Sequence, residues 1–346
     1  MKAERMADLK QAPHWLWTVG SLGAALCVTC GPAMANEPPT GYDVVDLGDL
    51  SLEELGHIPV TSVTGRPQSV QDAAASIFVI TAEDIRRSAA TSLPEALRLA
   101  PNLQVARVNA TQYAISARGF NNAIGNKLLV LIDGRTVYSP LFSGVFWDAQ
   151  QVMLEDIERI EVISGAGATL WGANAVNGVI NVITRVSQDT LGLLVAGRAG
   201  TSGNEGSMRL GKAFEGGAWR VYATQLDRSP TRLSSGQPID DHQDRQQLGF
   251  RSDWRKDTDA VTLQGDLYRA GGNGQTTTSA KLSGGNVLAR WHHDVADGSN
   301  WQLQAWFDQA DRDDAIEFRD HARTFDLEFN HVPSLGTQHQ LLWGLG

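Results

Sequence analysis

Residues 160–172 contain the segment most suggestive of a chemical site. Gly165 and Gly167 directly follow an apolar, strand-like run that begins at Ile160. A strand that leads into a Gly-x-Gly loop can hold a pyrophosphate at the N-terminus of the next helix. Here the third glycine falls at the wrong spacing, no amphipathic helix follows, and no acidic residue ends a second strand about twenty residues further on. We therefore interpret this segment as a sharp glycine turn.

The other ionisable residues do not form a catalytic or metal-binding pattern. A group of acids surrounds Arg159, and a solvated segment or partners for this arginine explain it more simply than a general acid and base. Its members are Glu155, Asp156, Glu158 and Glu161. His292 and His293 are adjacent in an expected strand, so they point to opposite faces and cannot chelate one metal ion together. We expect no catalytic residue, no metal site, no cofactor and no enzymatic activity.

Composition narrows the class of protein. The chain is 42% hydrophobic and 20% charged, which is not the composition of a disordered protein. Its formal net charge of −10 argues against a nucleic-acid binder. After the N-terminal segment no run reaches about 18 apolar residues, so membrane-spanning helices are not expected.

Residues 1–35 are predicted to be a secretory signal peptide. A positively charged start precedes the apolar run 15–28, and Ala33 and Ala35 form a small-x-small cleavage pattern. Cys27 and Cys30 both lie in this segment, so the mature chain would contain no disulfide. Residues 36–57 are expected to form a mobile leader.

Residues 58–185 predict one compact α+β domain. Thr81 followed by Asp84 is close to a capping box, and Asp133-Gly134 is a strong hairpin signal. Strands are expected at residues 76–80, 104–108, 113–118, 128–132, 136–138, 157–163 and 179–184, and helices at 82–87 and 92–100.

From residue 186 onward the pattern changes to strict alternation of apolar and polar residues. This period of two predicts about nine half-buried antiparallel strands of about ten residues each. Tight turns are expected at 214–218, 256–259, 296–299 and 333–336. They alternate along the chain with longer polar links at 229–244, 270–280 and 310–317. Trp219, Trp254 and Trp301 lie near strand ends, as interfacial aromatic girdles require. Together these features favour a transmembrane β-barrel over a soluble sheet.

Three runs then identify a family. They are TSLPEALRLAPNLQVARV at 91–108, AISARGFNNAIGNKLLVLIDGRTVYSP at 114–140 and DIERIEVISGAGATLWGANAVNGVINVITR at 156–185. In order and spacing they resemble the plug domain of TonB-dependent outer-membrane receptors. The family usually has Arg-Gly-Pro where this chain has Ser164-Gly165-Ala166, which removes one expected contact between plug and barrel wall. Arg118, Arg135 and Arg159 are candidates for other such contacts.

The resemblance implies a fold, a location and an activity. The fold is an α+β plug at 58–185, followed at 186–346 by antiparallel strands of a transmembrane β-barrel, about nine of the about 22 in a complete barrel. We therefore expect a fragment or a truncated product. The implied location is the outer membrane of a Gram-negative bacterium, with the plug facing the periplasm.

The implied activity is energised uptake of a scarce solute. A ferric siderophore or similar metal complex is the most frequent ligand of the family; cobalamin, haem or a sugar stay open. The alternatives are a receptor with mainly a signalling or adhesion role, or a non-functional fragment. A signalling receptor usually carries an extra domain before the TonB box, for which residues 36–55 are too few.

The implied partners are TonB with its inner-membrane energising complex, outer-membrane lipid and the solute, and not nucleic acid. A β-prone run at the position of the TonB box could pair with TonB by strand addition. The alternative is an ordinary edge strand of the same domain. The run consists of Ile58, Pro59, Val60, Thr61, Ser62 and Val63.

The solute is expected at the apical turns of the plug, at residues 109–112, 121–126 and 138–147. Aromatic rings there offer stacking, and arginines offer charge. The alternative for several of the aromatic residues is packing inside the plug. The predicted residues are Arg107, Asn109, Gln112, Tyr113, Asn121, Asn122, Arg135, Tyr138, Phe142 and Trp147.

Overall fold

The computed structural model describes residues 59–60, 68–69, 76–125, 127–165, 175–273, 279–314, 318–335 and 341–346. The predicted signal peptide and leader lie outside these residues. Within the predicted TonB box, strand β1 (Pro59–Val60) pairs antiparallel with β2 (Gln68–Ser69). Ile58 and residues 61–63 lie outside the described part of the chain.

A five-stranded sheet forms the centre of the α+β domain. Its order is β3 (Ser76–Thr81), β8 (Ile157–Ser164), β9 (Gly178–Thr184), β6 (Leu128–Ile132) and β7 (Arg135–Thr136). Only β6 and β9 pair in parallel. The near-continuous apolar runs of β6 and β9 are typical of strands covered on both faces. Accordingly, Val130 and Ile180 belong to a large core cluster, whereas Leu129 and Val179 belong to a second, smaller one.

Short helices and a hairpin cover this sheet. Helix α2 (Ala82–Arg87) begins at the predicted capping box: Thr81 Oγ1 accepts from the Asp84 amide at 3.1 Å, and the Asp84 carboxylate accepts from the Thr81 amide at 2.9 Å. The expected helix 92–100 is split. Helix α3 (Leu93–Ala96) tightens into the 3-10 turn η3 (Leu97–Leu99), because Pro101 prevents further α-helix.

Strands β4 (Gln104–Arg107) and β5 (Tyr113–Ser116) form a separate hairpin. Two further 3-10 turns, η4 (Leu154–Asp156) and η5 (Ser187–Thr190), flank the last plug strands. No helix in the described ranges is long and apolar enough to cross a membrane.

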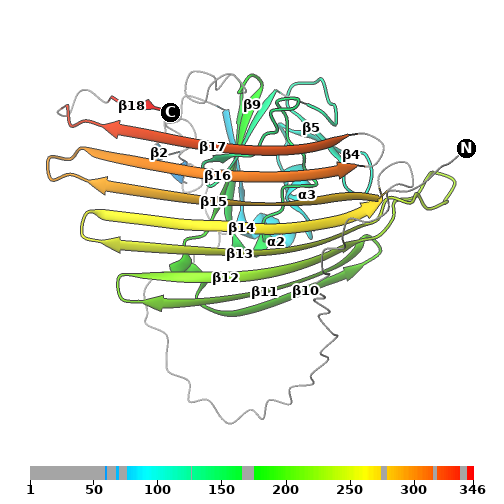
Figure 1. The fold of residues 1–346 in the computed structure, drawn as a ribbon. Coiled ribbons are helices and arrows are strands. Elements are labelled where there is room, and N and C mark those ends of the chain that lie inside the picture. Colours follow the sequence, from blue (N-terminus) through cyan, green and yellow to red (C-terminus); the bar gives the residue numbers. More distant parts are fainter. Residues whose placement is uncertain are drawn as a thin grey trace, which may run out of the picture. The chain divides into compact units, whose positions relative to one another are not determined.

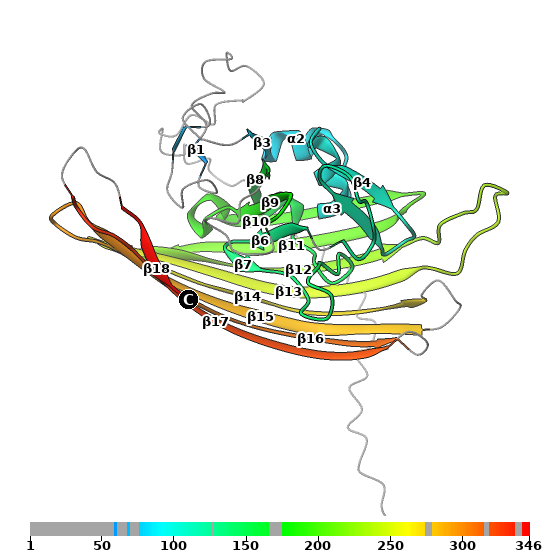
Figure 2. The same ribbon diagram turned by 90° about the horizontal axis from the view of Figure 1, so that it is seen from above.

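A nine-stranded antiparallel sheet follows, here called the wall. Each strand pairs with its neighbour in sequence, and the plug elements lie on the concave side of the sheet (Figures 1 and 2). The strands are β10 (Gly192–Gly200), β11 (Gly203–Phe214), β12 (Gly217–Arg228), β13 (Gln243–Lys256), β14 (Asp259–Asn273), β15 (Ser279–Asp294), β16 (Asn300–Asp314), β17 (Arg319–Val332) and β18 (Trp343–Leu345).

The wall strands are longer than predicted. Strands β13 to β17 contain 14 to 16 residues instead of about ten, and the expected links 270–280 and 310–317 are partly strand. For example, Gly271 pairs with Lys281. A strand ladder uses main-chain atoms, so it continues into polar sequence where apolar alternation has ended.

The two faces of the wall differ in chemistry. Exposed apolar side chains such as Val195, Leu248 and Leu267 point away from the plug, whereas Arg220 and Arg251 are buried on the plug side. This apolar-out, polar-in alternation is typical of membrane barrels. Near the short turns, outward rings pair up as predicted for a girdle. They include Phe214 with Trp254, 6.1 Å between centroids, and Trp291 with Trp301, 4.7 Å.

Candidate functional site: the plug and its contacts with the wall

The Asp133-Gly134 turn of the plug is held by four consecutive wall strands. Both residues have positive φ, +50° and +84°, as a two-residue hairpin turn requires. Gln264 Nε2 donates to the Asp133 carboxylate at 3.0 Å, and Gln304 Nε2 donates to the Gly134 carbonyl at 3.1 Å. Arg251 lies 3.7 Å from the same carboxylate, and Arg290 donates to the Asp133 carbonyl. The turn therefore has a fixed position on the wall.

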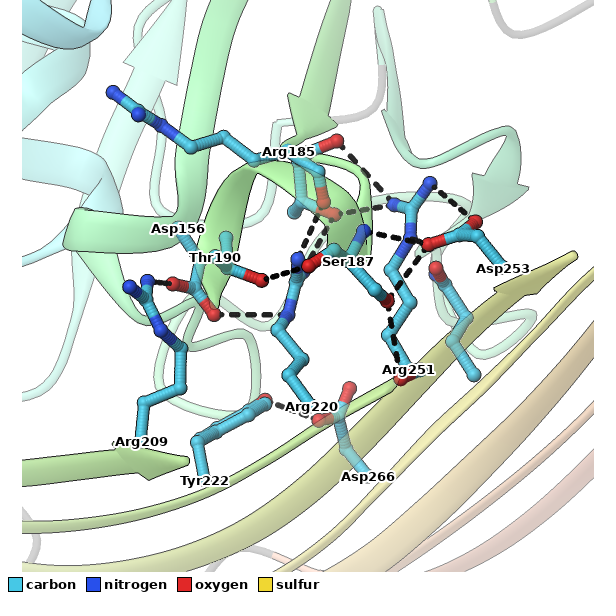
Figure 3. Close-up of polar contacts among 12 residues, drawn as sticks. Asp156, Arg185, Ser187, Thr190, Arg209, Arg220, Tyr222, Arg251, Asp253 and Asp266 are labelled. Atoms are coloured by element: carbon cyan, nitrogen blue, oxygen red, sulfur yellow. Dashed lines mark hydrogen bonds and ion pairs between the residues drawn. The ribbon is translucent and has the colours of Figure 1, made fainter. Parts of the chain in front are cut away.

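A second contact places one plug carboxylate between two wall arginines. Asp156 ends η4, and Arg209 and Arg220 reach it from β11 and β12 (Figure 3). Arg220 Nε lies 3.1 Å from Asp156 Oδ2, and Arg209 Nη1 donates to Oδ1. All three side chains are buried. Removing one partner of such a group leaves an uncompensated buried charge, which typically costs about 3–5 kcal/mol.

The segment that joins plug and wall is fixed to strand β13. Ser187 donates to the Asp253 carboxylate through its amide and its hydroxyl, both at 2.8 Å (Figure 3). Arg251 donates to the same carboxylate at 2.9 Å and to Thr184 Oγ1 at 2.8 Å. The end of β9 and the start of the wall are thus held together by side chains as well as by the chain.

The apical loop 138–150 is held by arginines from β13 and β16. Arg312 binds both carboxylate oxygens of Asp148, at 2.7 and 2.9 Å, and its guanidinium lies 4.1 Å from the centroid of Phe146. Arg245 donates to the carbonyls of Asp148 and Ala149 at 2.9 and 3.0 Å. The crevice beside this loop has a volume of about 50 Å³, enough for a few waters and too small for a chelate.

The β4–β5 turn contacts the first long link of the wall. The Ala110 amide donates to Asp241 at 2.9 Å, and Arg228 donates to the Ala110 carbonyl at 2.9 Å. Behind the turn, the Tyr113 hydroxyl donates to Glu95 at 2.8 Å. Burial raises the pKa of Tyr113, so this phenol remains a donor at neutral pH.

The structure separates the ten predicted solute residues into three groups by burial. The side chains of Asn109, Tyr113, Arg135 and Trp147 are buried. Tyr138 and Asn122 are exposed, and the other four are half-buried; those four are Arg107, Gln112, Asn121 and Phe142. Their solute-binding role stays a prediction, now centred on the exposed positions.

Exposed apolar residues also lie on this face. Phe120, Ile124 and Leu141 are exposed by 84%, 60% and 57% on the loops after β5 and β7. These loops are adjacent, because a Cβ on Gly144 would lie 2.5 Å from the carbonyl oxygen of Gly125. Apolar residues within Asn- and Gly-rich sequence are the signal that could have identified Ile124 and Leu141.

The predicted contacts between plug and wall are partly correct. Arg135 does reach the wall, with its Nη1 2.5 Å from Asp308 Oδ2. Arg159 instead pairs inside the plug with Glu158 and Glu161. Arg118 is exposed beside Gly165.

The interpretation of the acidic group as partners for Arg159 is correct for Glu158 and Glu161. It is wrong for Asp156, which is 2% exposed and bound to wall arginines. Asp133 and Asp148 were not predicted as contacts with the wall. The arginines that bind Asp133, Asp148 and Asp156 occupy the polar positions of the alternating strands, which was the available signal.

His292 and His293 contact different carboxylates, as expected for neighbouring side chains on opposite faces of a strand. His292 Nε2 lies 3.0 Å from Asp294, and His293 Nδ1 lies 2.8 Å from Asp259. The described part of the chain contains no group of three or more side chains suited to a metal ion.

Comparisons with known proteins agree with this geometry. Residues 69–179 match the model of the TonB-dependent Receptor Plug Domain. Vitamin B12 transporter BtuB of Vibrio vulnificus is 34% identical over 153 residues, 43% of this chain and 24% of the relative. Iron-regulated outer membrane virulence protein of Vibrio cholerae is 37% identical over 134 residues, 37% of this chain and 20% of the relative.

A solved structure shows the same fold. The ferric yersiniabactin uptake receptor FyuA from Yersinia pestis superposes with a TM-score of 0.62 at 14% identity, over 78% of this chain and 47% of that one. The chain thus spans about a quarter of the length of the first curated relatives and about half of such structures.

An α+β plug on the concave, polar face of antiparallel strands with an apolar outer face is the arrangement of a plugged outer-membrane barrel, of which this chain has a part. Residues 69–179 match the plug domain of TonB-dependent receptors, so the chain contains such a plug. Its location is the outer membrane of a Gram-negative bacterium.

Proposed function

We propose that this protein takes part in TonB-energised uptake of a scarce solute. The observation that carries the proposal is the attachment of the plug to the wall through buried charged groups, at Asp133, Asp148 and Asp156. A solute cannot pass between plug and wall while these contacts hold. Because the outer membrane has no energy source of its own, a pull from TonB would supply the work that moves the plug.

Capture would occur on the apical face of the plug. Tyr138, Asn122 and the exposed apolar residues Phe120, Ile124 and Leu141 form an accessible surface with stacking and hydrogen-bonding groups. Contiguous exposed apolar side chains commonly mark binding surfaces. The two predicted arginines are engaged in protein contacts, because Arg135 binds Asp308 and Arg107 donates to the Asn109 carbonyl at 3.0 Å. Arg118, two residues before Phe120, is exposed.

The TonB contact would form at residues 58–63. Strand addition uses main-chain hydrogen bonds, and Pro59–Val60 already has strand conformation. In the isolated chain the main chain of β1 pairs with β2, so TonB would compete with Gln68–Ser69 for the same groups.

The names of the relatives suggest a class of solute, which we take over as a proposal. Those relatives include a vitamin B12 transporter and a ferric enterobactin receptor. We propose a ferric siderophore or a comparable metal complex.

Growth tests the proposed function. A strain that lacks the gene, complemented with the full-length gene, should regain growth on one iron or cobalamin source supplied at a limiting concentration. Val60→Pro should abolish this rescue because it removes a strand donor from the TonB segment. The control Asp257→Asn, in a short turn with φ of +50°, should rescue fully, because asparagine tolerates this conformation. Rescue by Val60→Pro equal to wild type would contradict TonB coupling through this segment.

A further inference from the structure

A cavity of about 920 Å³ lies between the plug and strands β15 to β17. It is distinct from the small apical crevice, since its lining includes Asn300 and Val332, which pair at the short-turn ends of β16 and β17. Its volume falls within the range of small-molecule sites, about 300–1,000 Å³. Trp306 lines both spaces and lies between them along β16.

Both sides of this cavity combine apolar and polar groups. The plug contributes the apolar Leu129, Leu131 and Ile183 together with the polar Thr136 and Asn181. The wall contributes carboxamides at successive inward positions, Asn300, Gln302, Gln304 and Asn330. Gln302 pairs directly across from Asn330, whereas Gln304 is bound to the Gly134 carbonyl and to Arg290. Each carboxamide both donates and accepts, which suits neutral polar groups of a solute.

The cations that line the cavity are already engaged. Arg290 donates to Gln304 at 2.9 Å and to the Asp133 carbonyl. Arg159 donates to Glu161 at 2.8 Å and to Glu158.

The carboxylates on β17 are not neutralised in this way. Glu328 accepts a hydrogen bond from Asn330 at 2.6 Å, and Asp326 lies two residues away on the same inward face. No ion pair with either carboxylate occurs among the residues that the structure describes. Glu328 interacts electrostatically with Arg290, which is itself bound to Gln304 and Asp133, so β17 still adds negative charge to the cavity.

We infer that this cavity is a second solute site, a transit site on the inner side of the Asp133-Gly134 turn. It would take a bulky solute that presents both apolar groups and neutral amide or hydroxyl groups, and that has zero or positive net charge. A polyanionic chelate would be disfavoured, because it would meet Asp326 and Glu328 without a free cation on the wall. The inference rests on the proposed uptake function and narrows its substrate class.

Equilibrium binding to the purified full chain in detergent tests the site. Three probes of similar bulk differ in charge: neutral ferrichrome, cationic ferrioxamine B and trianionic ferric enterobactin. Titration calorimetry should detect ferrichrome and ferrioxamine B and show the weakest binding for ferric enterobactin. Asp326→Asn with Glu328→Gln should weaken ferrioxamine B about tenfold and leave ferrichrome within about twofold.

Two further variants locate the binding. Gln302→Leu with Asn330→Leu should weaken ferrichrome about tenfold, because it removes the neutral hydrogen-bonding pair. Asp320→Asn, on the same strand but lining the apical crevice, should leave all three titrations unchanged. Tightest binding by ferric enterobactin would overturn the inference. Insensitivity of every probe to the β17 and carboxamide variants, or no saturable binding of any probe, would also overturn it.

The titrations test the transit site and the growth experiment tests the proposed function, so either can fail without the other. Growth rescue that depends on Val60, together with a negative titration, would retain TonB-coupled uptake and reject the transit site. A positive titration without growth rescue would retain the site and reject uptake by this chain.

Discussion

At the scale of single residues, the plug is fixed by a few buried charged groups with distant partners. Asp156 and Asp133 each face wall arginines, and each would leave unpaired charge if it were replaced. The surface pairs of the plug, such as Glu83 with Arg86, contribute little by comparison because water screens them.

Replacement of Asp156 by asparagine should destabilise the folded chain by about 3–5 kcal/mol, since Arg209 and Arg220 would lose their buried partner. Urea unfolding followed by tryptophan fluorescence measures this. Asp189→Asn, at an exposed position of η5, is the matched control and should change stability by less than about 0.5 kcal/mol. Equal effects of the two changes would show that the Asp156 group does not hold the plug.

Gly134→Ala tests the contact between the turn and the wall, and a second glycine with almost the same φ serves as the control for backbone strain. Its φ is +84°, and a Cβ there would lie 2.9 Å from Arg290 Nη2 and 3.0 Å from Gln304 Oε1. Gly236 has φ of +85° with nothing within 4 Å of its Cβ position. Both glycine-to-alanine changes introduce about the same strain, roughly 1 kcal/mol. Gly134→Ala should therefore lower the free energy of unfolding in urea by about 1 kcal/mol more than Gly236→Ala does. No difference between the two would contradict the contact.

At the scale of elements, the five-stranded sheet is not equally protected. Strand β9 lies between β8 and β6, whereas β3 is an edge strand whose one described partner in the sheet is β8. The contacts with the wall described above come from β7, β9 and the loops and short turns between residues 109 and 188, and not from β3 or α2.

Hydrogen exchange should reflect this arrangement. Amides of β3 should exchange well before those of β9, because an edge strand can open without breaking two ladders. Mass spectrometry of peptides that cover 76–81 and 178–184 measures the order. Comparison with 128–132, which is buried like β9, supplies the internal reference. Simultaneous exchange of all three segments would mean that the plug opens as one unit.

At the scale of the whole molecule, the wall turns an apolar face away from the plug. Leu248 lies on this face and is 61% exposed in the isolated chain. An arginine on the lipid face of a barrel costs about 2–4 kcal/mol near the bilayer midplane.

Leu248→Arg should accordingly lower the amount of chain recovered in outer membranes. Leu233→Arg, the same change at an exposed residue of the link between β12 and β13, should leave recovery unchanged. Immunoblots of fractionated membranes measure both. Equal recovery would argue that this face of the wall does not meet lipid.

Local patterns of the sequence were sufficient for much of the fold. Alternation with period two gave the nine wall strands, and the Thr81–Asp84 cap and the Asp133-Gly134 turn were found where predicted. These features depend on residues within a few positions of one another, where φ/ψ preferences and one hydrogen bond decide the outcome. Three sequence runs were enough to identify the plug family.

Only the tertiary structure decided which side chains meet. Asp156 is buried against Arg209, 53 residues away, rather than solvated. Tyr113 and Trp147 are enclosed, whereas Tyr138 stays at the surface. The cavity between plug and wall depends on strands more than a hundred residues apart. Periodicity determines the face on which a side chain lies, but which groups lie across from that face depends on how separate sheets pack. That packing also decides which apical residues stay accessible and which arginines are engaged.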